Sequence, residues 1–147
     1  MRLVVQRVGK AKVIRVSDEK AVGEIGLGLF ILIGIKKGDS EKDADYLVEK
    51  VSKLRVMSDE DDKMNLSVGD VNGKILVVSQ FTLYADTKDG NRPSFINAED
   101  PVKAKKLYEY FIEKLRAKNI GVETGSFGDY MKIETILDGP VTILFSD

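Results

Sequence analysis

Two runs of consecutive apolar residues constrain the fold of this chain more than any other feature. Residues 29–35 read LFILIGI, and residues 74–81 read KILVVSQF. A short apolar run without alternation is typical of a strand that is buried on both faces. Such strands need other elements on each side of them, so the runs predict a sheet that lies inside the fold.

Further strand-type segments lie before and after these runs. Residues 2–16 interleave Val and Ile with polar residues and predict a strand that is bent or broken near Gly9. Shorter strands are predicted in four other segments, residues 20–26, 121–127, 131–137 and 141–145. The chain is therefore rich in strands, and their apolar faces need a covering layer.

Two amphipathic segments supply that layer. DSEKDADYLVEKVSKL predicts a helix with Ser40 as its cap and Asp43 at the capping-box position. DPVKAKKLYEYFIEKLRAKN predicts a second helix with Asp100 as its cap and Pro101 in its first turn. The predicted fold is α/β: a single domain over residues 1–147, with a mixed β-sheet in a barrel-like core and two main helices packed on it.

The amino-acid composition excludes several kinds of catalytic site. The chain has no His and no Cys, so a Ser-His-Asp triad, a Cys-His pair and the usual zinc ligands are all excluded. Carboxylates, lysines, hydroxyls, backbone amides or groups of the substrate remain as catalytic groups. We expect no metal and no cofactor.

Charge is nearly balanced, with 23 Lys and Arg against 24 Asp and Glu and a net charge of −1. A nucleic-acid partner would therefore have to be held by a local basic patch. Several lysines lie on the outer face of the second predicted helix. They are either an ordinary solvated surface or a site of phosphate contact: Lys103, Lys105, Lys106 and Lys114. Charges at Arg2 and Arg7 argue against a signal peptide. We expect a cytoplasmic location and no membrane partner.

Two short motifs place polar chemistry where a strand would otherwise continue. In SQFTL, alternation would bury Phe81 and Leu83. In the other interpretation, the strand end presents backbone N–H groups and the hydroxyls of Ser79 and Thr82 to an oxyanion. In DGPVT, Gly139–Pro140 is either an ordinary turn or a cis peptide. Neither motif decides the function by itself.

Taken together, VVSQFTLYADTKDGNRPSF and the later DGPVT resemble the D-aminoacyl-tRNA deacylase family. The resemblance extends over nearly the whole chain, through VVQRV, GEIG, GDSEKDADYL, KMNLSV and ETGSFGDYM. The two signatures are specific because they occur in this order and at this distance. One position departs from the family pattern: Leu137 stands where Asn is usual, so any hydrogen bond made by that Asn around the Gly-Pro turn is in question.

The resemblance implies a homodimeric editing enzyme. It would hydrolyse the ester of D-aminoacyl-tRNA, and also glycyl-tRNA mischarged on alanine tRNA. Gly139 and Pro140 would form a cis peptide inserted into the partner subunit's active site, where their carbonyl oxygens meet the substrate's amino group and exclude L-aminoacyl-tRNA. Arg7 is expected to brace this loop, Met131 to lie near the pocket, and Phe127 to stack on the terminal adenine of the tRNA.

The catalytic residues that the resemblance implies are Ser79, Gln80, Phe81 and Thr82. An aminoacyl ester is already activated, so the ribose 2′-OH of the substrate can orient or activate water without a protein base. The backbone N–H groups around Phe81 and Thr82 would then stabilise the oxyanion. The alternative mechanism uses Thr82 as a covalent nucleophile, although the sequence contains no partner base for it.

Three other functions stay open on the sequence. A related deacylase that edits L-alanyl-tRNA would differ by a trans Gly-Pro peptide. A non-catalytic tRNA-binding module could share the fold, although intact SQFTL and Gly-Pro motifs argue against decay. An imine or enamine deaminase of similar size needs a pocket arginine on a strand near the C-terminus, whereas Arg116 lies in a predicted helix.

Overall fold

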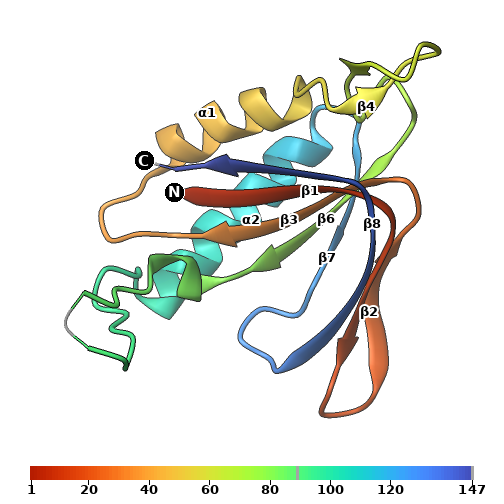
Figure 1. The fold of residues 1–147 in the computed structure, drawn as a ribbon. Coiled ribbons are helices and arrows are strands. Elements are labelled where there is room, and N and C mark those ends of the chain that lie inside the picture. The colour runs from red at the N-terminus through yellow and green to blue at the C-terminus, as the bar shows by residue number, and fades with distance from the viewer. Residues whose placement is uncertain (89, 147) are drawn as a thin grey trace.

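A computed structural model describes residues 1–88 and 90–146, and a six-stranded sheet runs through it (Figure 1). The strands are β1 (Arg2–Arg15), β2 (Lys20–Ile25), β3 (Gly28–Gly34), β6 (Lys74–Ser79), β7 (Gly121–Thr124) and β8 (Met131–Phe145). Their order is β2-β1-β3-β6-β7, and β8 pairs with β1. The β3–β6 and β6–β7 pairs are parallel, whereas β1 is antiparallel to each of its partners. The sheet is therefore mixed, as predicted.

The long strand β1 makes the sheet curl. Its first half, through Val8, pairs with β3, and its second half, from Ala11, pairs with β2. Its pairing with β8 shifts register twice between Gln6 and Lys10, which confirms the irregularity predicted near Gly9. Because β2 also packs against β6 and β7, the sheet closes partly on itself and forms the predicted barrel-like core.

The two predicted helices are present as α1 (Glu41–Ser52) and α2 (Pro101–Arg116). The capping box of α1 is formed, because Asp43 accepts hydrogen bonds from the backbone N–H and the hydroxyl of Ser40 at 2.8 and 2.7 Å. The side chain of Asp100 accepts from the Val102 N–H at 2.9 Å and caps α2. Within the described residues, no helix is long and apolar enough to cross a membrane.

Both helices lie on the same side of the sheet (Figure 1). A large core fills the space between them and the sheet, and it includes Val51, Ile31, Val77 and Phe111. A second cluster, with Val13, Phe30 and Leu76 among its members, fills the curl on the other side. Strands β3 and β6 are thus buried on both faces, as the two apolar runs predicted.

Three elements differ from the sequence prediction. The segment after Ser79 does not continue as a strand but forms a 3₁₀-helix, η1 (Phe81–Tyr84). Strand β8 is a single element that passes through the Gly-Pro dipeptide, because β1 pairs with it on both sides of that point. A hairpin of β4 (Met57–Ser58) and β5 (Met64–Leu66) was not predicted, and its strands are too short to produce a periodic pattern.

Candidate active site

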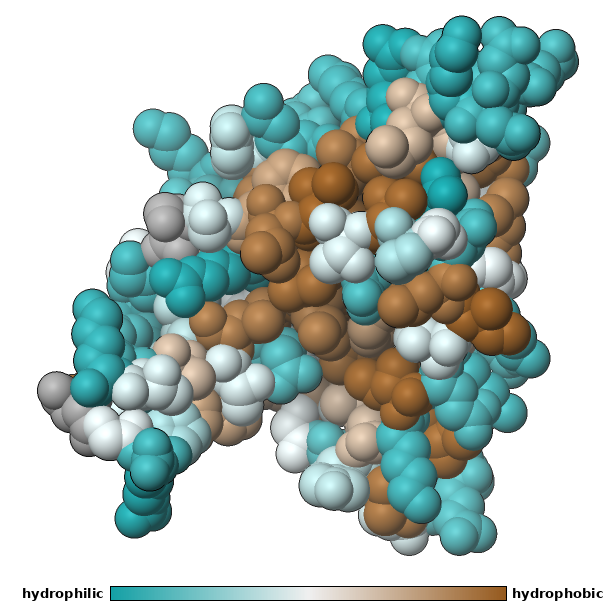
Figure 2. Space-filling view, in the orientation of Figure 1, coloured by the Kyte–Doolittle hydropathy of each residue, from teal (hydrophilic) through white to brown (hydrophobic). Residues whose placement is uncertain are grey.

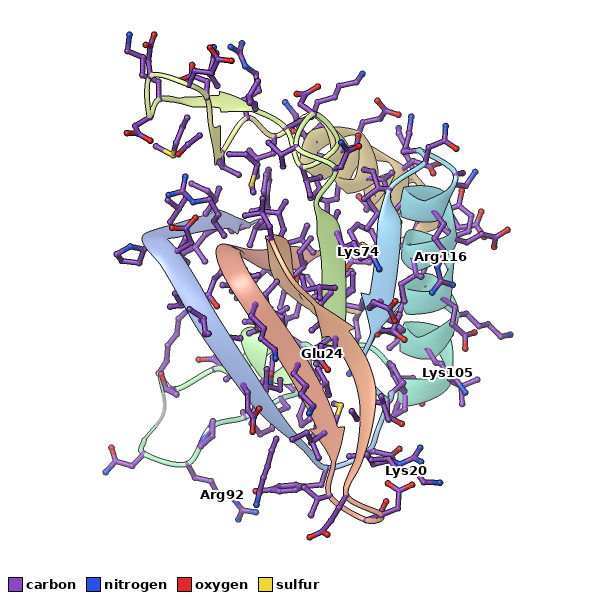
Figure 3. The ribbon with its side chains drawn as sticks, turned by 90° about the vertical axis from the view of Figure 1, so that its right-hand side faces the viewer. Lys20, Glu24, Lys74, Arg92, Lys105 and Arg116 are labelled. Carbon is purple, nitrogen blue, oxygen red and sulfur yellow. The ribbon has the colours of Figure 1, made fainter. Side chains whose placement is uncertain are left out.

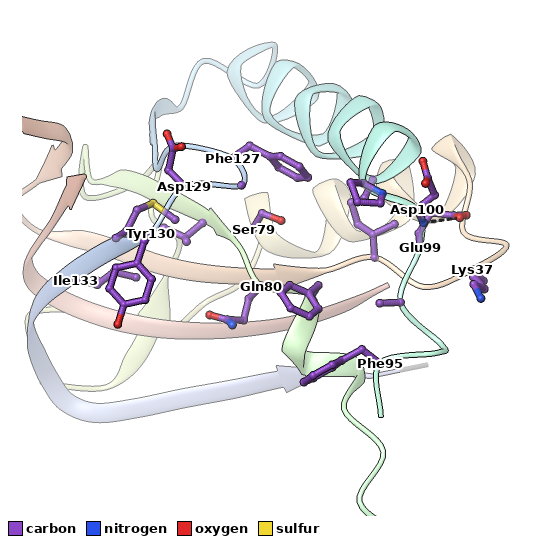
Figure 4. Close-up of a pocket in the computed structure, with 18 residues that line it drawn as sticks. Lys37, Ser79, Gln80, Phe95, Glu99, Asp100, Phe127, Asp129, Tyr130 and Ile133 are labelled. Atoms are coloured by element: carbon purple, nitrogen blue, oxygen red, sulfur yellow. Dashed lines mark hydrogen bonds between the residues drawn. The ribbon is translucent and has the colours of Figure 1, made fainter. Parts of the chain in front are cut away.

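A cavity of about 850 Å³ opens where the end of β6, η1, the start of α2 and the segment before β8 meet (Figure 4). Ser79, Gln80 and Phe81 line it from β6 and η1, and Phe127 and Met131 line it from the opposite side. Five of the residues singled out from the sequence therefore meet in one pocket. Most of its lining is apolar, which lowers the local dielectric and strengthens polar interactions inside it.

The SQFTL motif positions hydrogen-bond donors at the cavity. The parallel β3–β6 ladder ends when the Gln80 N–H donates to the carbonyl of Ile33 at 2.8 Å. The chain then turns into η1, whose first internal bond runs from the Leu83 N–H to the Gln80 carbonyl. Because a helix leaves its first N–H groups without internal acceptors, the N–H groups of Phe81 and Thr82 have no acceptor in the described part of the chain.

The side chains of this motif follow from the helical turn. The ring of Phe81 is 55% exposed, so the alternation that would bury it is wrong. The amide of Gln80 donates to the Thr82 hydroxyl, and Thr82 itself does not line the cavity. Among the described residues, the Ser79 hydroxyl has no hydrogen-bond partner, and it is the hydroxyl of the motif that lines the pocket.

The sequence did not point to Phe95, which forms part of the pocket rim. Its ring meets the ring of Phe81 edge to face, with the centroids 5.0 Å apart. The backbones of Asp86 and Ser94 exchange two hydrogen bonds of 2.8 Å, and Phe95 directly follows this pair. Phe95 is the last residue of the stretch VVSQFTLYADTKDGNRPSF, which carries the family resemblance. That resemblance did not predict a place for Phe95 in the pocket.

The segment before β8 forms the other wall. Phe127 packs against the buried ring of Tyr108, with a centroid distance of 5.6 Å. The Ser126 N–H donates to the sulfur of Met131 at 3.2 Å, and the Ser126 hydroxyl donates to Asp129. These contacts hold the Phe127 ring at the pocket. Tyr130, which the sequence analysis missed, lines the same end and is 79% exposed.

Charged residues gather at the far end of the pocket, beyond Phe127 in Figure 4. Glu99 accepts hydrogen bonds from the backbone N–H groups of Asp100, at 2.9 Å, and Gly38, at 3.4 Å. The bond from Asp100 is the main reason that the pKa of Glu99 is lowered. Lys37 is the one cation among the described lining residues. No motif in the sequence indicates this end of the pocket, because its residues come from separate loops.

Gly139, Pro140 and Arg7 do not line this cavity. The Gly139–Pro140 peptide is cis, and Gly139 has φ +127°. Arg7 holds the residue before it: its Nε donates to the Asp138 carbonyl at 3.1 Å and lies 3.2 Å from the Asp138 carboxylate. Its guanidinium also donates to the Val56 carbonyl at 2.9 Å. The dipeptide is therefore a separate, exposed feature of the surface, and the arginine that holds it is mostly buried.

The position that departs from the family pattern lies just before this feature. Leu137 pairs with Val8 in the β1–β8 ladder and is 44% exposed. Its side chain has no hydrogen-bonding group, and the contacts that hold the backbone beside the dipeptide come from Arg7.

The pocket can stabilise a developing negative oxygen and bind a flat ring. The Phe81 N–H and the Ser79 hydroxyl are donors on residues that line it, and Phe127 offers an aromatic face. The N–H of Thr82, the next residue along the chain, also has no acceptor in the described residues. Its carboxylates are already engaged: Glu99 and Asp100 accept backbone N–H groups, and Asp129 accepts the Ser126 hydroxyl. In the described residues, no three His, Cys, Asp or Glu side chains form a metal-binding group.

Comparisons with known proteins agree over nearly the full length. The model of a family described as D-Tyr-tRNA(Tyr) deacylase matches residues 4–146. A protein of Thermotoga petrophila named D-aminoacyl-tRNA deacylase is 56% identical over 98% of this chain and 95% of its own length. One of the same name from Limosilactobacillus reuteri is 53% identical over 99% of both chains.

Solved structures with the same fold give a second comparison. The structure described as c-Myc DNA unwinding element binding protein has a TM-score of 0.91 and 38% identity, and it covers 100% of this chain and 99% of that one. A probable eukaryotic D-amino acid tRNA deacylase has a TM-score of 0.84 over 98% of this chain and 97% of its own. At 17% identity, the second likeness concerns the fold alone.

Proposed function

The chain belongs to the D-Tyr-tRNA(Tyr) deacylase family, and on that premise we propose that its pocket hydrolyses the ester between a D-amino acid and the 3′ end of tRNA. It is an ester hydrolase that acts on aminoacyl-tRNA. Phe127 stacks on the terminal adenine, and Met131 lies beside the reacting ester. Base stacking on an aromatic side chain contributes about 1–3 kcal/mol, enough to anchor a 3′ end in an apolar site.

The observation that supports the mechanism is that the N–H groups of Phe81 and Thr82 have no acceptor in the described residues, while Phe81 and Ser79 line the pocket. Hydrolysis of an ester passes through a tetrahedral oxyanion, and donors fixed in advance stabilise it at no cost of reorganisation. Each such donor typically contributes about 10²–10³-fold to the rate. Gln80 holds the Thr82 side chain, and the ribose 2′-OH of the substrate orients or activates the water.

Thr82→Ala should remain active, with a loss of only a few-fold. The Thr82 hydroxyl is engaged with Gln80, and the variant keeps the backbone N–H that stabilises the oxyanion. We expect the loss of about one hydrogen bond, roughly 1 kcal/mol, or about a fivefold decrease in kcat. Single-turnover hydrolysis of D-aminoacyl-tRNA measures it. Complete inactivity in a folded variant that still binds tRNA would instead support Thr82 as a nucleophile.

Rejection of L-aminoacyl-tRNA is assigned to Gly139 and Pro140 of a partner subunit. Both residues are exposed, and neither lines the pocket of its own chain, which suits insertion into a second copy. Their carbonyl oxygens would meet the substrate's amino group and crowd the side where an L side chain projects. Arg7, fixed to Asp138 and Val56, keeps the dipeptide in position. Glycine has no side chain to clash, so glycyl-tRNA is a substrate as well.

The face that β8 crosses supports a homodimer. Hydrophobic side chains gather over the middle of this face in Figure 2, on the side of the sheet away from the helices. On β8, Ile136 is 64% exposed, Leu137 44% and Leu144 70%. Exposed apolar patches of this kind mark protein–protein interfaces, and this one lies on the strand that carries Gly139 and Pro140.

Leu144→Asp tests the dimer. A carboxylate in an apolar interface loses its hydration without gaining a partner, whereas the same residue on an exposed position of a monomer changes little. We expect a shift from dimer to monomer in sedimentation velocity, together with at least a tenfold loss of hydrolysis. Lys53→Asp, at the exposed C-cap of α1, is the control. A Leu144→Asp dimer with full activity would contradict this interface.

The activity itself is tested with paired D- and L-aminoacyl-tRNA esters of one amino acid. Loss of the D ester alone is the expected result, with glycyl-tRNA on alanine tRNA cleaved as well. Binding of both esters without hydrolysis would identify a non-catalytic tRNA-binding module. Cleavage of L-alanyl-tRNA in preference to the D ester would identify the related editing activity.

A further inference from the structure

A polar groove adjoins the catalytic pocket and is not used by the reaction described above. It has a volume of about 600 Å³ and runs between one face of α2 and the end of β7. Phe127 lines both the groove and the pocket, and a shallower depression beside Pro101 shares the same ring. A chain that leaves the pocket past Phe127 therefore enters this groove directly.

The helix that forms one side of the groove concentrates positive charge. Helix α2 contains five Lys or Arg and two Glu, a balance of +3, in a chain whose net charge is −1. Not all of this charge faces the groove: Lys114 lies over the ring of Tyr110 at 5.0 Å. The cations that line the groove are Lys105 and Arg116.

These two cations occupy opposite ends of the groove, and Figure 3 shows both along α2. Eleven residues of helix separate them, which corresponds to about 16 Å. Arg116 donates to the Val122 carbonyl at 3.0 Å, so its guanidinium is fixed in place with donors left over. Its side chain has no carboxylate partner in the described residues. Lys105 lies near Phe127 and has one distant partner, Glu109 at 3.9 Å.

We propose that this groove binds the sugar-phosphate backbone of the nucleotides that precede the terminal one. The inference rests on the proposed function, because it takes an RNA 3′ end in the pocket as its starting point. Lys105 contacts the phosphate nearest Phe127, and Arg116 contacts one farther along the strand. Thr124 lines the same groove, and its hydroxyl, which has no hydrogen-bond partner among the described residues, would add a neutral donor.

The groove also contains Glu109 and Glu113, and these carboxylates limit how tightly it binds a phosphate strand. Two carboxylates near a phosphate strand repel it, so binding is moderate and an edited tRNA can leave. Contacts to phosphates carry no base information. The groove therefore holds the 3′ strands of different tRNAs equally and leaves recognition of the ester to the pocket.

The test compares two substrates with the double variant Lys105→Gln/Arg116→Gln. With D-aminoacyl-tRNA, KM should rise about tenfold at unchanged kcat. With D-aminoacyl-adenosine, which has no preceding phosphate, both constants should stay the same. Fluorescence anisotropy of uncharged tRNA should show a salt dependence whose slope falls by about 1.4, the amount expected for two phosphate contacts of a single strand.

Matched variants distinguish a loss of phosphate contacts in the groove from general effects of charge and folding. Lys53→Gln/Lys63→Gln removes the same charge elsewhere and should leave KM and the salt slope unchanged. Glu113→Gln should act in the opposite sense and tighten tRNA binding. Arg116→Lys keeps the charge, so it should retain most of the affinity even where the Val122 contact is weakened.

Failure of the groove proposal and failure of the proposed function would give different experimental results. If the double variant matches the wild type in KM and in salt slope, the groove does not contact the strand, and the proposed function stands. If the wild type hydrolyses neither ester, the proposed function fails. The anisotropy measurement with uncharged tRNA then still decides whether RNA follows the groove.

Discussion

Gly139→Ala is expected to reduce hydrolysis of D-aminoacyl-tRNA at least about 100-fold in a protein that still folds. Gly139 has φ +127°, a conformation that residues with a Cβ rarely adopt. A Cβ built there lies 2.9 Å from both the backbone nitrogen and Cγ2 of Val141, and 3.2 Å from a guanidinium nitrogen of Arg7. The dipeptide or its brace must therefore move, and a displacement of about 1 Å at a site of this kind costs about 10²-fold.

Two controls make this result specific. Gly90→Ala introduces a Cβ at another positive φ, +111°, with nothing within 4 Å, and it should retain activity. Circular dichroism and sedimentation velocity report whether the Gly139 variant remains folded and dimeric. Nearly full activity of Gly139→Ala with unchanged preference for the D ester would show that Gly139–Pro140 is an ordinary surface turn.

The central layer of the fold could be predicted because the residue pattern of each strand, taken alone, indicates that the strand is buried. Ile31 and Val77 lie in runs that are apolar on consecutive positions, and only a strand covered on both faces accommodates such runs. Helix starts are equally local: Ser40 and Asp43 form the capping box that their spacing predicted. The curl of the sheet was predicted as a barrel-like core with a bend near Gly9. Which strands close it could not be predicted, because closure depends on pairing between distant strands.

The turn at Phe81 shows why part of the site escaped prediction. Alternation along β6 would have buried this ring, but the strand ends when Gln80 has made its last bond to β3. The backbone then forms η1, which exposes Phe81 and leaves its N–H free. Nothing in the residues from Gln80 to Tyr84 specifies a 3₁₀ turn more than a strand. The choice is made by the end of the neighbouring strand, which is a tertiary effect.

The far end of the pocket could not be predicted for a different reason. Lys37, Phe95 and Glu99 come from loops, and no periodicity or motif links their positions. They meet because the Lys37 N–H donates to the Asn97 carbonyl, and the Glu99 N–H donates to the Ile35 carbonyl, each at 3.0 Å. These backbone contacts bring two connections, more than fifty residues apart in the chain, to one rim.

A substrate with hydrogen in place of the terminal 2′-OH should be bound but not hydrolysed. The chain offers no histidine, and the three carboxylates among the described lining residues are all engaged as acceptors, Glu99, Asp100 and Asp129. These carboxylates are held by backbone N–H groups or by a hydroxyl, and hydrogen bonding lowers the pKa of Glu99, which makes it a weaker base. The neighbouring ribose hydroxyl, in contrast, is adjacent to the ester. Removal of that hydroxyl leaves the oxyanion donors in place but removes the group that orients the nucleophile.

We expect no hydrolysis of 2′-deoxy D-aminoacyl-tRNA on the time scale of the normal reaction. Its affinity should stay within about threefold of the normal substrate, since one exposed hydrogen bond contributes about 0.5–1.5 kcal/mol. Rapid-mixing hydrolysis and equilibrium binding on the same preparations give both numbers, and spontaneous hydrolysis of each ester in buffer is the reference. Thr82→Ala provides the matched protein variant. If the 2′-deoxy ester is cleaved at the normal rate by the wild type but not by Thr82→Ala, the threonine is the nucleophile, and the ribose hydroxyl has no part in the reaction.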